Sequence, residues 1–523
     1  MKKIFYALMA LATLSLASCN KELLNTNPTD AVSGDTVFTD ADGALMALNG
    51  TLRFFWQWGS TTTSNYHQSF GPQSYNLMAD LMGEDMVMAA SGSGWFWYDY
   101  IYNVKSRYTS GGWRSYDCWN YYYTLISSVN YILDAKEIEG DPATIDYVMG
   151  NAYAIRAYAY AYCAMVFARS YIGHEDRLSI PIYTEPTFAG TAGKPRSTNR
   201  EVFAQAMSDI NKAIELLGDT PQMHVSHIDK YVANGIKARI ALYMGDYQTA
   251  HDAAAIAVKG GSIAYDSTFH YNDATHASVL WGAEIISTQG TTNPQFLVHM
   301  DYRYGGYGNT ARKCASAWLI DQMGPEDKRA TDWWSYEVLN DGSTKGYQQY
   351  KFLFKDPKDT YNGADHIFMR APEMQLIIAE TACRLGNESE AKAALNELMK
   401  TRDAGFDCSN KTGTDLAPIT TDKTGSLLEE IILQRRIELW GESGRIYDIK
   451  RLRQGFVRTS DMGHPSAALL GNLHLDDPES FDWVLTIPQV EFDANPYMVQ
   501  NPVSSYATST EDDNPSLTPK VEE

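Results

Sequence analysis

A helical spacing of apolar residues dominates the chain. In the clearest case, Thr198 and Glu201 form the capping-box pattern that opens a helix, and Gly218 stands where that helix would stop. The apolar positions between them recur every three or four residues, at Val202, Ala206, Ile210, Ala213 and Leu217. A second stripe runs through Trp119, Tyr123, Ile126 and Asn130. Residues 145–171 carry a series of alanines, which predicts close packing between helices.

Two further segments resemble each other and predict paired helices. Gly245-Asp246 and Gly386-Asn387 each follow a helical segment and lead into another helix rich in small residues. Tetratricopeptide units have this arrangement, because one helix pair cannot bury its apolar face alone. The copies are irregular and far apart. The pattern therefore predicts an all-α dominated scaffold of tetratricopeptide-type helix pairs with long loop-rich insertions and a few short strands.

The first residues have the pattern of an export signal. Lys2 and Lys3 precede a short apolar run, and small residues then lead to Cys19. We interpret residues 1–18 as a signal peptide, Cys19 as a lipidated first residue, and residues 19–35 as a tether. A signal-peptide cleavage site that happens to contain a cysteine is the alternative. Past residue 20, no stretch is long and apolar enough to span a bilayer as a helix.

Composition and charge exclude several function classes. The chain is 44% hydrophobic and 20% charged, as in globular proteins, and its net charge is −21. That charge repels phosphate and anionic lipid, so we expect no nucleic-acid partner and favour a neutral ligand. The cysteines after Cys19 lack metal spacing, and we expect most to be buried, with one disulfide possible. We expect no metal or cofactor, and we interpret Asp40 as part of a helix N-cap rather than a calcium loop.

Aromatic residues gather outside the helical pattern and carry the candidate chemistry. The chain has 34 Tyr and 12 Trp, many of them in two loop regions. A flat ring with one polar group suits the C–H face of a pyranose, and nearby amides or guanidinium groups would bind the hydroxyls. For each ring, packing of a loop onto a helix is the alternative. The candidate ligand-binding residues are Trp95, Trp97, Tyr98, Asn103, Arg107, Trp113, Tyr302, Tyr304, Trp333 and Trp334.

Motifs from Cys19 to about Pro502 occur in a specific order. The most specific are Arg370 to Glu380, Arg435-Arg436-Ile437-Glu438-Leu439 with its following charged residues, and Ile487-Pro488 with Gln500-Asn501-Pro502. Earlier motifs are Leu48-Asn49-Gly50, Ala79 to Asp85, Arg156-Ala157-Tyr158 and Pro195-Arg196. In this order they resemble the RagB/SusD family of Bacteroidetes outer-membrane lipoproteins. Gln434 departs from the pattern, where relatives commonly carry Glu, and we expect it to change only a structural ion pair.

The resemblance implies a fold and a function. It implies a SusD-like scaffold with an N-terminal region at 36–218 and a C-terminal region at 219–523, in which 262–365 is rich in loops. It also implies a non-catalytic lipoprotein at the outer membrane that binds an oligosaccharide or polysaccharide and delivers it to a SusC-like TonB-dependent transporter.

Two other functions remain open from the residues alone. An exported all-helical glycoside hydrolase would share the aromatic loops and the export signal, and a tetratricopeptide-type adaptor for proteins would share the helix pairs. The charged block with Glu438, Glu442, Arg445, Asp448 and Arg451 alternates in sign at helical spacing. This alternation favours interlocked ion pairs over a catalytic carboxylate pair.

Overall fold

The computed structural model describes residues 37–59, 65–90, 92, 94–103, 112–188, 190–286, 295–338, 345–356, 358 and 365–501. The expected signal peptide, the lipidation site Cys19 and the tether lie outside the described residues. Among the described residues, no helix is both long and apolar enough to cross a membrane. The fold is rich in helices with few short strands, so the predicted fold class is confirmed.

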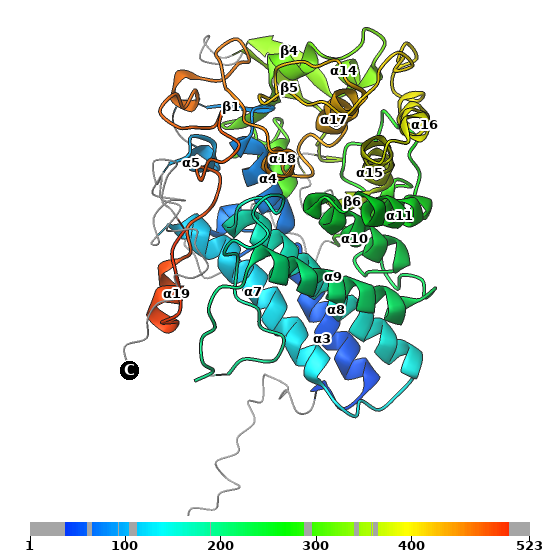
Figure 1. The fold of residues 1–523 in the computed structure, drawn as a ribbon, viewed down its shortest axis with the longest axis vertical. Coiled ribbons are helices and arrows are strands. Elements are labelled where there is room, and N and C mark those ends of the chain that lie inside the picture. The colour runs from blue at the N-terminus through cyan, green and yellow to red at the C-terminus, as the bar shows by residue number, and fades with distance from the viewer. Residues whose placement is uncertain are drawn as a thin grey trace, which may run out of the picture.

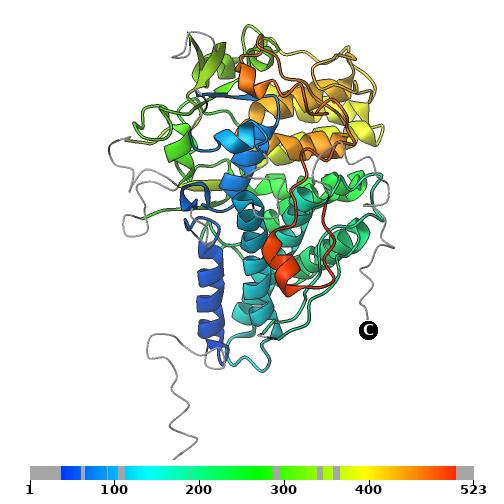
Figure 2. The same cartoon turned by 90° about the vertical axis from the view of Figure 1, so that its left-hand side faces the viewer.

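Four helices lie side by side at one end of the molecule (Figures 1 and 2). α8 contacts α9, α7 and α3, and α3 also contacts α7. Most of the α8 surface is buried, and its many alanines let the neighbouring helices approach closely. The four helices are α3 (Ala41–Arg53), α7 (Trp113–Asp134), α8 (Pro142–Phe167) and α9 (Asn199–Leu217).

The predicted helix signals are confirmed locally. Both hydrogen bonds of the Thr198–Glu201 capping box are present at the start of α9, and Gly218 follows its last residue. Asp40 caps α3, because its Oδ1 accepts a hydrogen bond from the Gly43 backbone N–H at 2.8 Å. Each helix therefore begins where its sequence pattern placed it.

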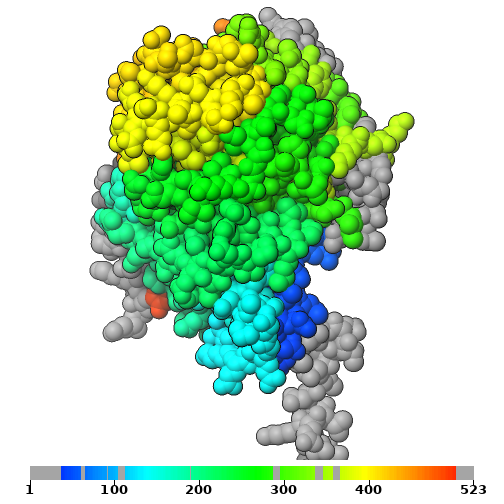
Figure 3. All heavy atoms as spheres, turned by 90° about the vertical axis from the view of Figure 1, so that its right-hand side faces the viewer, coloured from blue at the N-terminus to red at the C-terminus, as the bar shows by residue number. Residues whose placement is uncertain are grey.

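The two look-alike segments form helix pairs that pack against each other. The first pair is α10 (Lys230–Met244) and α11 (Tyr247–Ala257), and the second is α15 (Ala371–Arg384) and α16 (Glu388–Met399). Gly245 and Gly386 have φ of 77° and 84°, the left-handed conformation that ends each first helix. α11 contacts α15, so the pairs are neighbours in space although distant in sequence. Figure 3 shows this face, where the green and yellow segments form one continuous surface.

The strands form two small antiparallel sheets. One has the order β1-β3-β5-β4 and the other pairs β2 with β6. In the larger sheet, Met86 of β1 lies opposite Ala315 of β3, although the two are far apart in the chain. The strands are β1 (Met86–Ala89), β2 (Val279–Ala283), β3 (Arg312–Ala315), β4 (Trp334–Val338), β5 (Lys345–Gln349) and β6 (His366–Arg370).

Short helices complete the described fold, and one large hydrophobic cluster holds it together. That cluster draws side chains from Ala44 to Met498, so both regions expected from the sequence contribute to it.

The five described cysteines are free and buried, which confirms them as small core residues. The short elements are η2 (Tyr66–Gln68), α4 (Pro72–Met82), α5 (Trp97–Tyr100), η3 (Val258–Gly260), α12 (Phe296–Met300), α13 (Ala317–Ile320), α14 (Lys328–Asp332), α17 (Leu427–Glu438), α18 (Arg445–Leu452), η4 (Ser466–Ala468) and α19 (Gln489–Ala494).

Buried ion pairs join the two ends of the chain. Arg436 of α17 contacts Asp85 at 2.6 Å and Glu84 at 3.0 Å, and Arg445 of α18 contacts Glu84 at 2.9 Å. The side chains of all four residues are at most 5% exposed. Burial alone would raise the pKa of Glu84, but Arg445 and Arg436 outweigh it and lower that pKa to about 2.

A second buried network surrounds Glu438. Its carboxylate accepts two hydrogen bonds from Arg402, both at 2.8 Å, and also pairs with Arg329 and Arg370. Gln434 lies in the same network, where its Oε1 accepts a hydrogen bond from Arg329 at 2.6 Å. The charged block is therefore used for packing, as its alternating signs predicted.

We expect Arg436→Met to lower the free energy of unfolding by about 3 kcal/mol, because Arg445 alone must then compensate the buried carboxylates of Glu84 and Asp85. Arg200→Met is the matched control, because its 2.9 Å pair with Asp176 is mostly exposed and should contribute less than about 1 kcal/mol. Urea unfolding at neutral pH measures both. Equal losses in the two variants would contradict the importance of the buried network.

Candidate functional site

Six partly exposed aromatic rings from three separate segments lie one against the next. Trp58 and Tyr66 are 41% and 38% exposed, and the other four are half-buried. Trp58 follows α3, Tyr66 and His67 form most of η2, Trp95 precedes α5, and two tyrosines follow α12. We call this set the aromatic ladder; it consists of Trp58, Tyr66, His67, Trp95, Tyr307 and Tyr304.

Successive rings of the ladder are in stacking or tilted contact. The centroid distances are 5.3 Å from Trp58 to Tyr66, 4.1 Å from Tyr66 to His67 and 4.9 Å from His67 to Trp95. Trp95 then stacks on Tyr307 at 5.7 Å, and Tyr307 on Tyr304 at 6.5 Å. The planes from His67 to Tyr304 differ by only 22° to 24° between these neighbours. His67 and Tyr307 are also stacked at 5.6 Å, so His67, Trp95 and Tyr307 form a compact triangle of similarly oriented rings, which Tyr66 and Tyr304 extend.

Hydrogen bonds to His67 join η2 to the segment after α12. Tyr307 Oη hydrogen-bonds His67 Nδ1 at 2.7 Å. His299 of α12 contacts the His67 carbonyl oxygen through its Nε2 at 2.8 Å, so this nitrogen must donate. Burial lowers the pKa of His299 well below its usual value, which keeps its ring neutral at physiological pH.

A buried arginine connects two of the segments that carry the ladder. Arg114 of α7 donates to the Gln68 carbonyl oxygen of η2 at 3.0 Å and to both carboxylate oxygens of Asp99 in α5. It also pairs with Asp117 at 3.2 Å, and its side chain is fully buried. The same residue thus positions the segments that carry His67 and Trp95 relative to each other.

An exposed turn carries the far end of the ladder. Asp301 is fully buried and accepts hydrogen bonds from Arg303 Nη2 at 2.7 Å and from the Phe354 backbone N–H at 2.9 Å. Arg303 also donates to the Phe354 carbonyl oxygen at 2.6 Å. These bonds hold the turn with Tyr304 and Tyr307 against the segment around Phe354, so the ladder is preformed.

The structure brings only some of the predicted site residues together. Trp95 and Tyr304 belong to the ladder. Tyr302 lies beside it in sequence, but its ring contacts Tyr350 at 5.4 Å. Tyr98 is 53% exposed, and its carbonyl oxygen accepts a hydrogen bond from the backbone N–H of the half-buried Asn103 at 2.9 Å. Arg107 lies outside the described residues.

Three predicted tryptophans are buried in the core, and a fourth lies against an arginine. Trp97, Trp333 and Trp334 are 4%, 3% and 2% exposed, so their faces are not available to a ligand. Trp113 is half-buried, and the Arg114 guanidinium covers its ring at 4.2 Å. For the three buried rings the sequence expectation needs correction: Trp333, for example, holds the Lys351 ammonium 4.5 Å from its centroid. Large rings at loop–helix junctions are drawn into the core.

Sequence reasoning did not select Trp58, Tyr66, His67 and Tyr307 as ligand residues. A signal was present, because Trp58 and Tyr66 lie in an aromatic segment after a helix and Tyr307 follows Tyr302 and Tyr304 among glycines. What the sequence lacks is any sign that these segments meet. Among the described residues, no cluster of three or more His, Cys, Asp or Glu side chains could hold a metal ion.

Comparisons with known proteins agree on one family. The profile of the SusD family matches residues 241–503, and a profile described as starch-binding associating with outer membrane matches residues 63–242. A SusD-like protein of Formosa agariphila is 21% identical over 506 residues, which cover 86% of this chain and 91% of that protein.

Solved structures share the fold. The chain is similar to a SusD-like carbohydrate binding protein from Bacteroides vulgatus, with a TM-score of 0.74 and 24% identity over 88% of this chain and 97% of the other. It is also similar to a SusD superfamily protein from Bacteroides thetaiotaomicron, with a TM-score of 0.71 and 22% identity over 88% of this chain and 100% of the other.

We expect the pKa of His67 to lie below 6.5, because burial among its neighbouring rings disfavours the charged imidazole. Since the folded protein then binds this proton less tightly than the unfolded chain, the contribution of His67 to stability is complete above about pH 6.5 and declines as the pH falls below it. Proton NMR titration of the imidazole signals measures the midpoint, and His67→Phe assigns the resonance. A midpoint at or above 6.5 would contradict the burial argument.

Proposed function

The chain belongs to the SusD family, and from this premise we propose that it binds an oligosaccharide or polysaccharide at the outer membrane for nutrient uptake. The observation that carries the proposal is the aromatic ladder. Its half-exposed rings offer flat apolar faces, which stack on the C–H faces of sugar rings with roughly 1 kcal/mol per contact, by analogy with aromatic pairs. Several such contacts give weak to moderate affinity.

Charge supports a neutral ligand. With a net charge of −21, the protein repels sulfated or uronate-rich glycans at long range. We propose that Asn103 and Arg107 bind sugar hydroxyls and that Tyr98 offers a further ring face; Arg107 lies outside the described residues.

We further propose how the bound glycan enters the cell. Lipid on Cys19 holds the protein at the cell surface, where it covers a SusC-like TonB-dependent transporter and delivers the glycan to the barrel. Several acyl chains on one cysteine are enough for stable anchoring. The protein acts as a binder rather than an enzyme, which is consistent with the use of its buried acidic block in ion pairs.

Affinity electrophoresis against a panel of neutral polysaccharides tests the ladder. We expect Trp95→Ala to weaken binding about five- to tenfold, because one stacking contact is lost. Met223→Ala removes an apolar side chain that is 52% exposed elsewhere, and should leave the mobility shift unchanged. The proposal fails if no neutral polysaccharide retards the protein, or if both variants behave alike. Release of reducing ends would instead identify a glycoside hydrolase.

Metabolic labelling and pull-down test the anchor and the partner. We expect radioactive palmitate in the wild-type protein and none in Cys19→Ala, because the cysteine is the acylated residue. Pull-down of the wild-type protein from solubilised outer membranes should recover a large transporter barrel. Label in Cys19→Ala would refute the anchor, and recovery of soluble proteins alone would favour the adaptor function.

A further inference from the structure

A groove separate from the ladder lies at the opposite end of α3. It has a volume of about 830 Å³, within the range of ligand sites. Residues 38–40, which precede α3, form part of its wall, whereas Trp58 of the ladder follows the other end of that helix. The 13 residues of α3 span about 20 Å, so the groove and the ladder are distinct sites.

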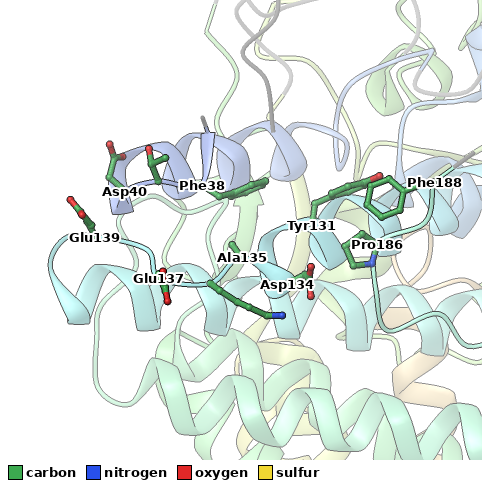
Figure 4. A pocket seen from close by; sticks show the side chains of 11 residues that line it. Phe38, Asp40, Tyr131, Asp134, Ala135, Glu137, Glu139, Pro186 and Phe188 are labelled. Carbon is green, nitrogen blue, oxygen red and sulfur yellow. The ribbon is translucent and has the colours of Figure 1, made fainter. Parts of the chain in front are cut away.

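The groove has an aromatic end and an acidic end (Figure 4). Tyr131 and Phe188 lie edge-to-face with centroids 5.8 Å apart, and they remain 36% and 67% exposed. Asp40, Glu137 and Glu139 lie toward the other end, where residues 40 and 139 form a backbone bridge. Together with Pro186, the two rings give the groove an exposed apolar wall.

Hydrogen bonds hold the aromatic wall in place without a ligand. Tyr131 Oη donates to the Thr187 carbonyl oxygen at 2.8 Å, and Asn130 Nδ2 donates to the Tyr183 carbonyl oxygen at 2.8 Å. The Phe188 backbone N–H donates to Thr191 Oγ1 at 2.8 Å. The segment that carries Phe188 is therefore fixed on α7, and binding requires little ordering of this wall.

The negative charge of the residues that line the groove favours a positively charged ligand. Its wall carries the carboxylates of Asp40, Asp134, Glu137 and Glu139, and Lys136 is the single positive residue among those lining it in the described chain. Asp134, Glu137 and Glu139 form no ion pair with another described residue. Aromatic faces beside carboxylates also attract ammonium groups through their ring electrons.

The chain itself does not supply that cation. The preceding segment, residues 20–36, contains Lys21 but also Glu22, Asp30 and Asp35, so its charge does not complement the groove. A second copy of the chain carries the same net charge of −21 and is repelled. The occupant is therefore an external molecule.

The backbone around the groove argues against a peptide as that molecule. The Glu139 carbonyl oxygen already accepts from the Ala41 backbone N–H at 2.8 Å, and the Thr39 carbonyl oxygen accepts from the Glu139 N–H at 3.0 Å. The Phe188 carbonyl oxygen likewise accepts from the Thr191 N–H at 2.9 Å. A peptide strand that paired with the backbone here would have to share these carbonyl oxygens with the bonds already present. Flat ring faces next to carboxylates suit a sugar ring that bears a protonated amine.

We propose that this groove is a second carbohydrate site, which binds an oligosaccharide with free, protonated amino groups. Phe188 and Tyr131 stack on the sugar rings, and Asp134, Glu137 and Glu139 bind the ammonium groups. This site goes beyond the proposed function at the ladder and does not depend on it.

Calorimetry with full-length protein and a β-1,4-linked glucosamine hexasaccharide at mildly acidic pH tests the proposal. Cellohexaose is the matched neutral probe, because it has hydroxyl groups in place of the amines. We expect the amino sugar to bind at least tenfold more tightly than cellohexaose, and added salt to weaken it. Phe188→Ala should weaken it about five- to tenfold without any change in protein charge.

Charge variants separate the groove from the general negative field. Asp134→Asn with Glu137→Gln should weaken binding of the amino sugar about tenfold. Asp461→Asn, which removes an exposed carboxylate elsewhere, and Met223→Ala, which removes an exposed apolar side chain elsewhere, should leave it unchanged. The proposal is overturned if cellohexaose binds as tightly, if the Phe188 and Asp134 variants match these controls, or if hexalysine binds through the groove in preference to the amino sugar.

Discussion

The cost of burying an unpaired charge governs the arrangement of this protein. Glu84 and Asp85 follow α4 near the start of the chain, and Arg436 and Arg445 lie in α17 and α18 near its end. None of these groups can be buried alone, because each would lose its hydration without compensation. The four must therefore meet, and when they do they bring β1, α4, α17 and α18 to one place.

The ladder depends on the same principle at a smaller scale. Asp99, Asp117 and Arg114 are fully buried, and their pairing forces η2, α5 and α7 into one geometry. Tyr66 and His67 lie in η2, and the other four rings lie on turns, where a surface can vary without disturbing the packing. A rigid helical scaffold thus carries a binding surface made from segments that are far apart in sequence.

The two proposed sugar surfaces differ in chemistry because they differ in surroundings. At the ladder, the charged groups next to the rings are buried and paired, as Arg114, Asp99 and Asp117 show, so the rings dominate the exposed surface. At the groove, the carboxylates remain exposed beside the rings and keep their charge available. From that contrast we infer that the ladder stacks on neutral sugars and that the groove binds ammonium groups.

The sequence by itself determined what depends on neighbours in the chain. The capping box at Thr198 set the start of α9, the glycines at 245 and 386 set the helix pairs, and the ordered motifs identified the family. Only the tertiary structure decided which rings are exposed: Trp95 and Trp97 are two residues apart, yet the first joins the ladder and the second is 4% exposed. The physical reason is that the exposure of a ring depends on which distant segment packs against it. The contact between His67 and Tyr307, 240 positions apart, leaves no local trace in the sequence.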